Sequence, residues 1–149
     1  MAKLLQWNMR GLQANREDLS LLLSSIKPTI VALQETNIGK NHSINFQNYS
    51  FYNTPGIETN GIYRGGSVLL VNKTTPHSLV SLRTNLQATA IRITIFKTIT
   101  VCSVYLPPSC ISSWSTRRCP RYRDCESSIR YSLCIYRGPL RIPHRPTTH

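Results

Sequence analysis

The amino-acid sequence predicts a mixed α/β fold in residues 1–109 of the 149-residue chain. Near the N-terminus, a strand-like run precedes one amphipathic helix and a second, more apolar strand. Further along the chain, an apolar run follows a glycine pair, and two alternating segments form a hairpin. A strand, a helix, a strand and then several antiparallel strands is the element order of a layered α/β domain.

The first two elements lie within residues 3–28. Lys3–Asn8 (KLLQWN) is predicted to be a strand that ends on a polar, uncharged amide. Asn15 is a candidate helix N-cap, and Asp18 lies in the first turn, where a negative charge is favourable. Pro28 ends the helix. The apolar residues between these limits recur at helical spacing, as Leu19, Leu22, Leu23 and Ile26.

Four further strands are predicted. Thr29–Leu33 (TIVAL) and Gly65–Val71 (GGSVLLV) are short apolar runs of the kind found in buried strands. Ala90–Ile95 and Thr98–Tyr105 are predicted to form a hairpin around a two-residue turn, Phe96–Lys97. Alternation in the first of these places three isoleucines on one face, namely Ile91, Ile93 and Ile95.

Residues 110–149 have a different composition. The net charge of the chain is +12, and this 40-residue tail carries as much of it as the first 109 residues do, +6 each. Every basic residue of the tail is an arginine, and four of the five cysteines lie there. The apolar residues of the tail show no helix or strand periodicity, and prolines recur near its end. We therefore predict an irregular tail.

The overall charge favours polyanionic partners, with nucleic acid first and an anionic membrane surface second. No run of about 18 apolar residues is present, so no transmembrane helix is expected, and no basic amphipathic helix supports the membrane alternative. The N-terminus has no apolar signal segment. We therefore expect a reducing compartment, in which the cysteines are thiols rather than a disulfide framework.

Four pieces of the chain, in order, resemble the endonuclease/exonuclease/phosphatase family. They are LQWNMRG at 5–11, VALQET at 31–36, GGSVLLV at 65–71 and VYLPPS at 104–109. More narrowly, they look like the apurinic-type endonuclease domain of jockey-like non-LTR retrotransposon polyproteins. The resemblance covers residues 1–109 and implies the N-terminal part of a two-sheet α/β sandwich, with its site at strand ends between the sheets.

The resemblance also implies an activity. The family domain nicks DNA with Mg²⁺ and leaves a 3′-hydroxyl that primes the reverse transcriptase (RNA-directed DNA polymerase), so DNA is the expected partner and intracellular, nuclear action is expected. Asn8 matches the asparagine beside metal and phosphate, and Glu35 matches the metal-binding glutamate. Tyr105 matches the tyrosine that contacts the scissile phosphate. The resemblance thus assigns catalysis to Asn8, Glu35 and Tyr105, and metal binding to Glu35 and Asn8.

The residue types agree with this chemistry, although each also has an ordinary structural explanation. Mg²⁺ prefers carboxylate oxygen, which Glu35 supplies, and an amide at Asn8 donates to a phosphate without adding negative charge. Alternatively, Asn8 is a turn residue, Glu35 is a solvated strand end, and Tyr105 packs beside Pro107–Pro108. Arg10 lies on a solvated face or contacts a DNA phosphate. Four further residues are either ordinary loop and surface residues or DNA contacts, namely Gly65, Gly66, Arg64 and Lys73.

Two motifs that the family carries are missing. Neither the Gly-Asp-Phe-Asn strand end nor the later Ser-Asp-His stretch is present, and the one aspartate after Tyr105 is Asp124 in RYRDCESS. The acidic residue that can follow the first asparagine is replaced by Met9–Arg10. We therefore expect a truncated, catalytically incomplete domain, with a non-catalytic, basic nucleic-acid-binding protein as the alternative function.

The tail allows three explanations. A shifted reading frame after VYLPPS would account for its abrupt composition, in a degenerate retroelement copy or a gene-model fragment. A real module could bind RNA or single-stranded DNA, because its arginines alternate with aromatic residues. A zinc site is a weaker possibility because the spacing C-x8-C-x5-C-x8-C contains no C-x-x-C pair. Its cysteines are Cys110, Cys119, Cys125 and Cys134, and its aromatic residues are Trp114, Tyr122, Tyr131 and Tyr136.

Overall fold

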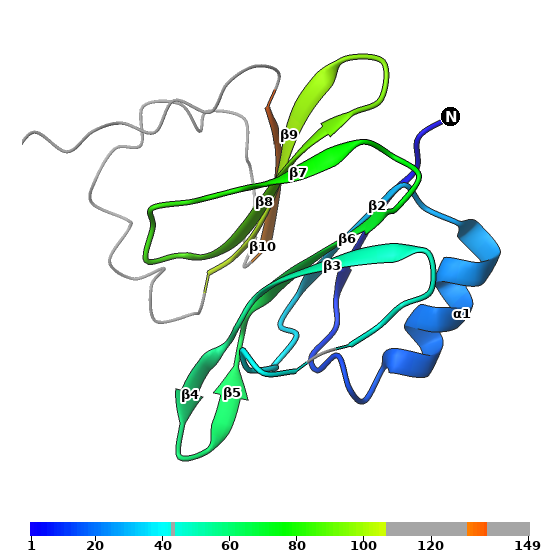
Figure 1. Cartoon of the computed structure of the whole chain (residues 1–149). Coiled ribbons are helices and arrows are strands. Elements are labelled where there is room, and N and C mark those ends of the chain that lie inside the picture. The colour runs from blue at the N-terminus through cyan, green and yellow to red at the C-terminus, as the bar shows by residue number, and fades with distance from the viewer. Residues whose placement is uncertain (43, 107–130, 137–149) are drawn as a thin grey trace, which may run out of the picture.

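The computed structural model describes residues 1–42, 44–106 and 131–136. Two four-stranded sheets lie against each other, with one helix beside the first (Figure 1). This arrangement confirms the predicted mixed α/β sandwich. Within the described residues, no helix is long and apolar enough to cross a membrane.

The first sheet, here called the N-terminal sheet, has the strand order β1-β2-β6-β3. β1 (Leu4–Asn8) runs parallel to β2 (Ile30–Gln34), while β6 (Ser67–Asn72) is antiparallel to both of its neighbours, β2 and β3 (Tyr49–Thr54). The ends of β1, β2 and β3 therefore meet the beginning of β6 at a single edge. Polar residues gather at this edge.

The second sheet, the C-terminal sheet, is antiparallel throughout, with the order β10-β9-β8-β7. Between β3 and β6, the chain forms a separate two-stranded hairpin, β4–β5. The bounds of these strands are β4 Ile57–Thr59, β5 Ile62–Arg64, β7 His77–Val80, β8 Gln87–Thr94, β9 Thr98–Tyr105 and β10 Tyr131–Tyr136.

Helix α1 (Arg16–Ile26) packs on the outer face of the N-terminal sheet. Asn15 is the N-cap residue, as predicted, but its side chain makes no capping hydrogen bond to the helix. Its Nδ2 instead donates to the carbonyls of Met9 and Gly11, at 2.7 and 3.0 Å, and so ties the β1–α1 loop to the helix start. The helix ends at Lys27, whose left-handed conformation (φ 50°) lets its N–H donate to the carbonyl of Leu23.

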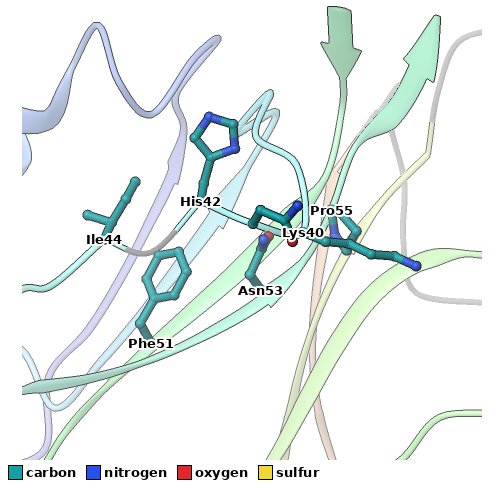
Figure 2. A pocket seen from close by; sticks show the side chains of 7 residues that line it. Lys40, His42, Ile44, Phe51, Asn53 and Pro55 are labelled. Atoms are coloured by element: carbon teal, nitrogen blue, oxygen red, sulfur yellow. The ribbon is translucent and has the colours of Figure 1, made fainter. Parts of the chain in front are cut away.

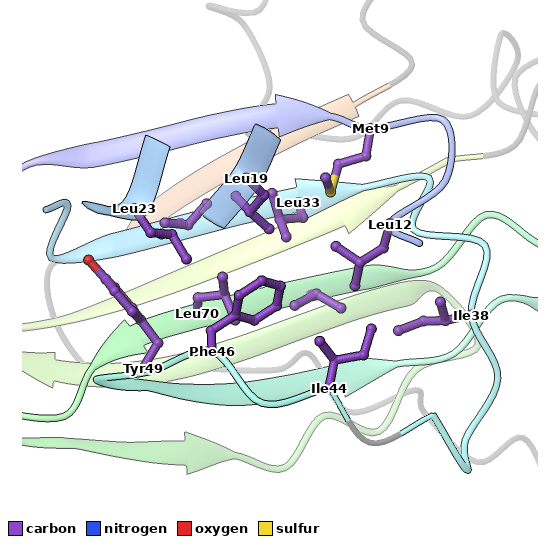
Figure 3. Close-up of a cluster of buried hydrophobic side chains, with 12 residues drawn as sticks. Met9, Leu12, Leu19, Leu23, Leu33, Ile38, Ile44, Phe46, Tyr49 and Leu70 are labelled. Carbon is purple, nitrogen blue, oxygen red and sulfur yellow. The ribbon is translucent and has the colours of Figure 1, made fainter. Parts of the chain in front are cut away.

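Two apolar cores flank the N-terminal sheet because its strand residues alternate between its faces. The core between sheet and helix consists of Met9, Leu12, Leu19, Leu23, Val31, Leu33, Ile38, Ile44, Phe46, Tyr49, Val68 and Leu70 (Figure 3). The core between the two sheets consists of Ile30, Ala32, Leu69, Val71, Ile91, Ile93 and Val101.

The predicted elements agree with the structure to within a few residues. β9 has the predicted bounds, but β8 begins at Gln87 rather than Ala90, and the loop between these strands has three residues, 95–97. β6 begins at Ser67, after the glycine pair rather than with it. β3, β4, β5 and β7 were not predicted because they are short or half-exposed and lack an apolar run.

β10 is a strand within the tail for which no regular structure was predicted. It pairs with β9 over its full length, from Tyr131 opposite Tyr105 to Tyr136 opposite Thr100. Pairing across about thirty residues of chain depends on the partner strand, which a local pattern does not reveal. The remaining predictions for residues 110–149, including the zinc alternative, fall outside the described residues.

Leu19 and Leu21 offer a matched test of the helix packing. Leu19 is fully buried and Leu21 is 69% exposed on the same helix. Leu19→Ala should lower the free energy of unfolding by about 2–5 kcal/mol, whereas Leu21→Ala should change it by less than about 0.5 kcal/mol. Urea denaturation measures both values, and similar losses for the two variants would contradict the packing of α1.

Tyr49 predicts a pH dependence of stability. Its buried hydroxyl donates to the Pro28 carbonyl at 2.7 Å, and burial raises its pKa above the ordinary value near 10. The unfolded phenol ionises first, so this stabilisation is present below about pH 10 and is lost as the pH rises through the folded pKa. Tyr49→Phe should cost about 1 kcal/mol at pH 8. The difference from wild type should shrink between pH 9 and 11 in urea denaturation, and a constant difference would contradict the burial argument.

Candidate functional site

A row of four polar residues closes the edge at which the strands of the N-terminal sheet meet. Asn8 lies opposite Gln34, Gln34 opposite Ser67, and Ser67 opposite Thr54. Residues opposite each other in a sheet project from the same face. Gln34 contacts Ser103 of the other sheet, so the whole row faces the interior of the sandwich.

The C-terminal sheet meets this row with a polar row of its own, in which Thr89 lies opposite Ser103. Gln34 Nε2 donates to Ser103 Oγ at 2.7 Å, and Ser67 Oγ donates to the Ser103 carbonyl at 3.0 Å. Thr89 Oγ1 lies 2.8 Å from Thr54 Oγ1 and 3.0 Å from the Ser67 carbonyl. Hydrogen bonds therefore join the two sheets at this end, where apolar packing stops. We call these residues the polar layer; they are Gln34, Thr54, Ser67, Thr89 and Ser103.

Tyr105 and Gln87 lie opposite each other one step beyond the polar layer. The Gly66 N–H donates to Gln87 Oε1, and the Gly65 N–H donates to Asn37 Oδ1 at 2.8 Å. Gly65 has a φ of +79°, and a Cβ there would lie 2.6 Å from Tyr105 Cε1. Only glycine lets the backbone lie this close to the tyrosine ring, so Gly65 fixes one side of Tyr105.

Glu35 begins the loop that follows β2. It is half-buried and has a left-handed conformation (φ 51°), and its carbonyl accepts from the Gly11 N–H at 2.8 Å. Arg10 (φ 50°) and Asn37 (φ 53°) share this conformation. Such backbone is uncommon outside glycine and concentrates at functional sites. Three examples therefore lie in the two adjacent loops at this end of the sheet.

The structure thus brings the three predicted site residues to one end of the sandwich. Asn8 is the last residue of β1, and Glu35 directly follows Gln34, the strand neighbour of Asn8. Tyr105 is the last residue of β9 in the other sheet and is 8% exposed. The Gln34–Ser103 hydrogen bond and the close contact of Gly65 with Tyr105 join the two sheets at this end.

The donor atoms at this end suit a hard cation. Among the described residues, Asn8 Oδ1 and Gln34 Oε1 are buried without a hydrogen-bond partner, and a buried acceptor of this kind is costly unless something binds it. No group of three or more histidine, cysteine or acidic residues occurs in the described part of the chain. Carboxylate, amide and water oxygens suit hard divalent cations such as Mg²⁺, whereas thiolate and imidazole ligands suit softer metals, so the donor types of Glu35 and Asn8 fit a hard divalent cation.

The sequence motifs did not single out the residues that position this site. Gln34 is part of VALQET and completes a fully buried strand. A buried glutamine needs a hydrogen-bond partner, so its place at the end of an apolar run was a signal in the sequence for a contact of this kind. Ser103 lies inside an apolar strand, and Gln87 lies before the predicted start of its strand. No local pattern indicates that either one contacts the other sheet.

Exposed cations flank the same end. Arg10 follows β1, Lys40 lies in the loop after β2, and Arg64 ends the β4–β5 hairpin. Arg10 is exposed, as both of its sequence-based alternatives require. Positive charge at a polar strand edge would attract a phosphate-bearing ligand.

A pocket of about 400 Å³ lies beside this end, between β3 and the loop after β2. Asn53 Nδ2 donates to the Gly39 carbonyl at 3.1 Å along its wall. None of the three predicted site residues lines it, so the pocket and the strand-end site are separate features. Its lining residues are Lys40, Asn41, His42, Ile44, Phe51, Asn53 and Pro55 (Figure 2).

Comparison with known proteins gave two matches. The model of the Endonuclease/Exonuclease/phosphatase family matches residues 5–146, which include both compositional halves of the chain. A relative, the RNA-directed DNA polymerase from mobile element jockey of Drosophila melanogaster, is 32% identical over 106 residues. That alignment covers 69% of this chain and 11% of the relative, so the chain spans a small part of the relative's length.

Gly65 and Gly61 allow a matched test of the backbone packing at Tyr105. Both have positive φ, +79° and +76°, but a Cβ at Gly61 meets nothing within 4 Å. Gly61→Ala should cost about 1 kcal/mol through backbone strain alone. Gly65→Ala should cost about 1–3 kcal/mol more, because its methyl group overlaps Gln87 and Tyr105. Equal losses in urea denaturation would contradict the close approach.

Proposed function

The chain belongs to the endonuclease/exonuclease/phosphatase family, and on this basis we propose that it is an endonuclease-type domain of a jockey-like retrotransposon polyprotein. The proposed substrate is DNA, and the proposed ancestral reaction is metal-dependent cleavage of a phosphodiester bond. The observation that carries this proposal is the convergence of Asn8, Glu35 and Tyr105 on one strand-end edge.

Each residue has a distinct role in the proposal. The Glu35 carboxylate and Asn8 Oδ1 hold a divalent cation, for which Mg²⁺ is the natural choice. When bound, Mg²⁺ neutralises charge on the phosphate and on the leaving oxygen. The Tyr105 hydroxyl and Asn8 Nδ2 donate to phosphate oxygens and so orient the bond to be cleaved.

The polar layer keeps these groups in place. The Gln34–Ser103 hydrogen bond fixes the end of β2, and Glu35 follows it directly. The close contact with Gly65 positions Tyr105 at the end of β9 in the other sheet. Preorganised donors of this kind stabilise developing charge without reorganising during the reaction.

We further propose that the chain alone does not complete the reaction. Its sequence has neither the Gly-Asp-Phe-Asn nor the Ser-Asp-His motif that would activate water and bind the phosphate. Loss of a general base alone slows such a reaction by about 10²–10⁴-fold. The chain is therefore proposed to hold the metal and the phosphate while cleaving DNA slowly or not at all.

Two assays on the full chain test this proposal. Mn²⁺ is a paramagnetic substitute for Mg²⁺, and its binding is followed by electron paramagnetic resonance of the free ion. Wild type should bind Mn²⁺, and Glu35→Gln should bind it at least about tenfold more weakly, because a charged oxygen ligand is lost. Glu17→Gln is the matched control, since Glu17 is exposed in the first turn of α1. Equal affinity of wild type and Glu35→Gln would contradict the metal role.

The second assay is nicking of supercoiled plasmid with Mg²⁺, with EDTA and Glu35→Gln as controls. The expected result is no nicking above the EDTA background. Mg²⁺-dependent nicking that disappears in Glu35→Gln would show that the chain contains a complete site, and the incompleteness proposal would then be wrong.

A non-catalytic, basic nucleic-acid-binding protein is the second candidate. The net charge of +12 and the exposed cations Arg10, Lys40 and Arg64 favour it. This candidate requires DNA binding that is unaffected by EDTA and by Glu35→Gln, and no Mn²⁺ site at Glu35.

A further inference from the structure

Two cysteines lie opposite each other in the C-terminal sheet. Cys102 is in β9 and Cys134 is in β10, and the antiparallel register pairs these two positions directly. β10 lies at one edge of the sheet, beside β9 (Figure 1). Positions directly opposite each other belong to the same face of a sheet. The fold therefore brings together two cysteines that are far apart in the chain.

The backbone spacing at such a pair suits a disulfide. Opposite residues of an antiparallel ladder have Cα atoms about 4.5 Å apart at a non-hydrogen-bonded position and about 5.5 Å apart at a hydrogen-bonded one. A disulfide spans Cα separations of about 4.4–6.8 Å. Both kinds of position fall within this range, so a bond between the two sulfurs needs no change of strand register.

Cys102 belongs to the outer face of the C-terminal sheet. Its neighbours along β9 face the other sheet, since Val101 lies in the core between the sheets and Ser103 lies in the polar layer. Because side chains alternate along a strand, Cys102 projects from the opposite face. It is 8% exposed and packs with Ala88 and Ala90. The cysteine pair is therefore separate from the candidate site.

Access to the pair is through the edge strand. Among the described strands, β10 pairs with β9 alone, whereas β9 pairs on both sides. Opening β10 breaks one ladder of hydrogen bonds rather than two, so local opening is easier there than within the sheet. Such an opening exposes Cys102 to a small oxidant, and reclosure returns the two cysteines to opposite positions.

We propose that Cys102 and Cys134 form a reversible disulfide with a small-molecule disulfide, such as oxidised glutathione, as the oxidant. The thiolate of one cysteine attacks a sulfur of the oxidant, which forms a mixed disulfide and releases one reduced glutathione. The thiolate of the other cysteine then attacks the protein sulfur of the mixed disulfide and releases the second reduced glutathione. Two protein thiols are thus oxidised while one glutathione disulfide is reduced to two thiols.

The disulfide would fasten β10 to the strand that ends at Tyr105. The register that places Cys134 opposite Cys102 also places Tyr131 opposite Tyr105, so the bond would hold both pairings. In a reducing compartment the same two residues are thiols, in agreement with the composition of the chain. This inference does not depend on the proposed function, because its test follows neither metal nor DNA.

The first test identifies the bond by mass spectrometry. The folded full chain is incubated with oxidised glutathione, remaining thiols are blocked with N-ethylmaleimide, and the unreduced protein is digested with trypsin and chymotrypsin. Trypsin isolates Cys134 from the other cysteines, and chymotrypsin cleaves after Tyr105, between Cys102 and Cys110. We expect two peptides joined through Cys102 and Cys134, which separate after treatment with dithiothreitol.

Oxidation in concentrated urea is the control. Without strand pairing, Cys134 should link mainly to Cys125, its nearest cysteine in the sequence, because a shorter loop closes at a lower entropic cost. A Cys102–Cys134 link that is equally abundant in urea would overturn the inference. In the folded chain, preferential linkage of Cys134 to any cysteine other than Cys102 would also overturn it, as would blocked thiols at both positions.

The second test measures the melting temperature of the oxidised and reduced chains. A disulfide between β9 and β10 closes a loop of about thirty residues and should raise the melting temperature by about 10 °C. Cys134→Ser, in the edge strand, and Cys102→Ala should each remove this difference. Cys119→Ser is the matched control and should keep it. A difference that persists in Cys134→Ser would overturn the inference, because another pair of cysteines would then account for it.

Discussion

The site depends on the polar layer that joins the two sheets at one end. Elsewhere the sheets meet through aliphatic side chains, which pack without direction. At the strand ends, hydrogen bonds replace this packing: Ser103 alone accepts from both Gln34 and Ser67. Because a buried polar group left without a partner costs free energy, these bonds favour one relative position of the sheets. Asn8, Glu35 and Tyr105 lie at this layer and take their relative positions from it.

Backbone conformation at the same end supports this arrangement. Arg10 and Glu35 adopt left-handed backbone in the loops that follow β1 and β2, where the chain leaves the N-terminal sheet. Gly65 does the same on the opposite side and brings the chain against Tyr105. The surrounding hydrogen bonds, such as that from the Gly11 N–H to the Glu35 carbonyl at 2.8 Å, hold these conformations. The exposed surface at this end therefore consists of loops on two sheets that are joined by hydrogen bonds and close packing.

The β4–β5 hairpin extends this surface outward (Figure 1). Tyr63 against Gly39 fixes it to the loop that begins at Glu35, and Gly65 fixes it to Tyr105. Contacts on one face thus leave the other face, with Ile57 and Ile62, directed away from the protein.

The sequence by itself determined the local elements and named the three residues that are proposed for the site. The helix over Arg16–Ile26, the buried β2 and the β8–β9 hairpin follow from apolar periodicity, which depends on neighbours in the chain. The motifs that carry Asn8, Glu35 and Tyr105 were also apparent, because each ends a predicted strand or directly follows one.

Only the tertiary structure decided how these parts meet. Gln34 forms its hydrogen bond with Ser103, which lies 69 residues away, and β10 pairs with β9. No local sequence pattern indicates either partner. The Asn15 amide binds the carbonyls of Met9 and Gly11 instead of capping its helix, because the folded loop presents those acceptors. The exposure of Ile57 and Ile62 on the β4–β5 hairpin is likewise a tertiary result, since the packing of Tyr63 on Gly39 determines which face of the hairpin is buried. Local propensity selects elements, whereas long-range hydrogen bonds and packing select their register and the face that each one presents.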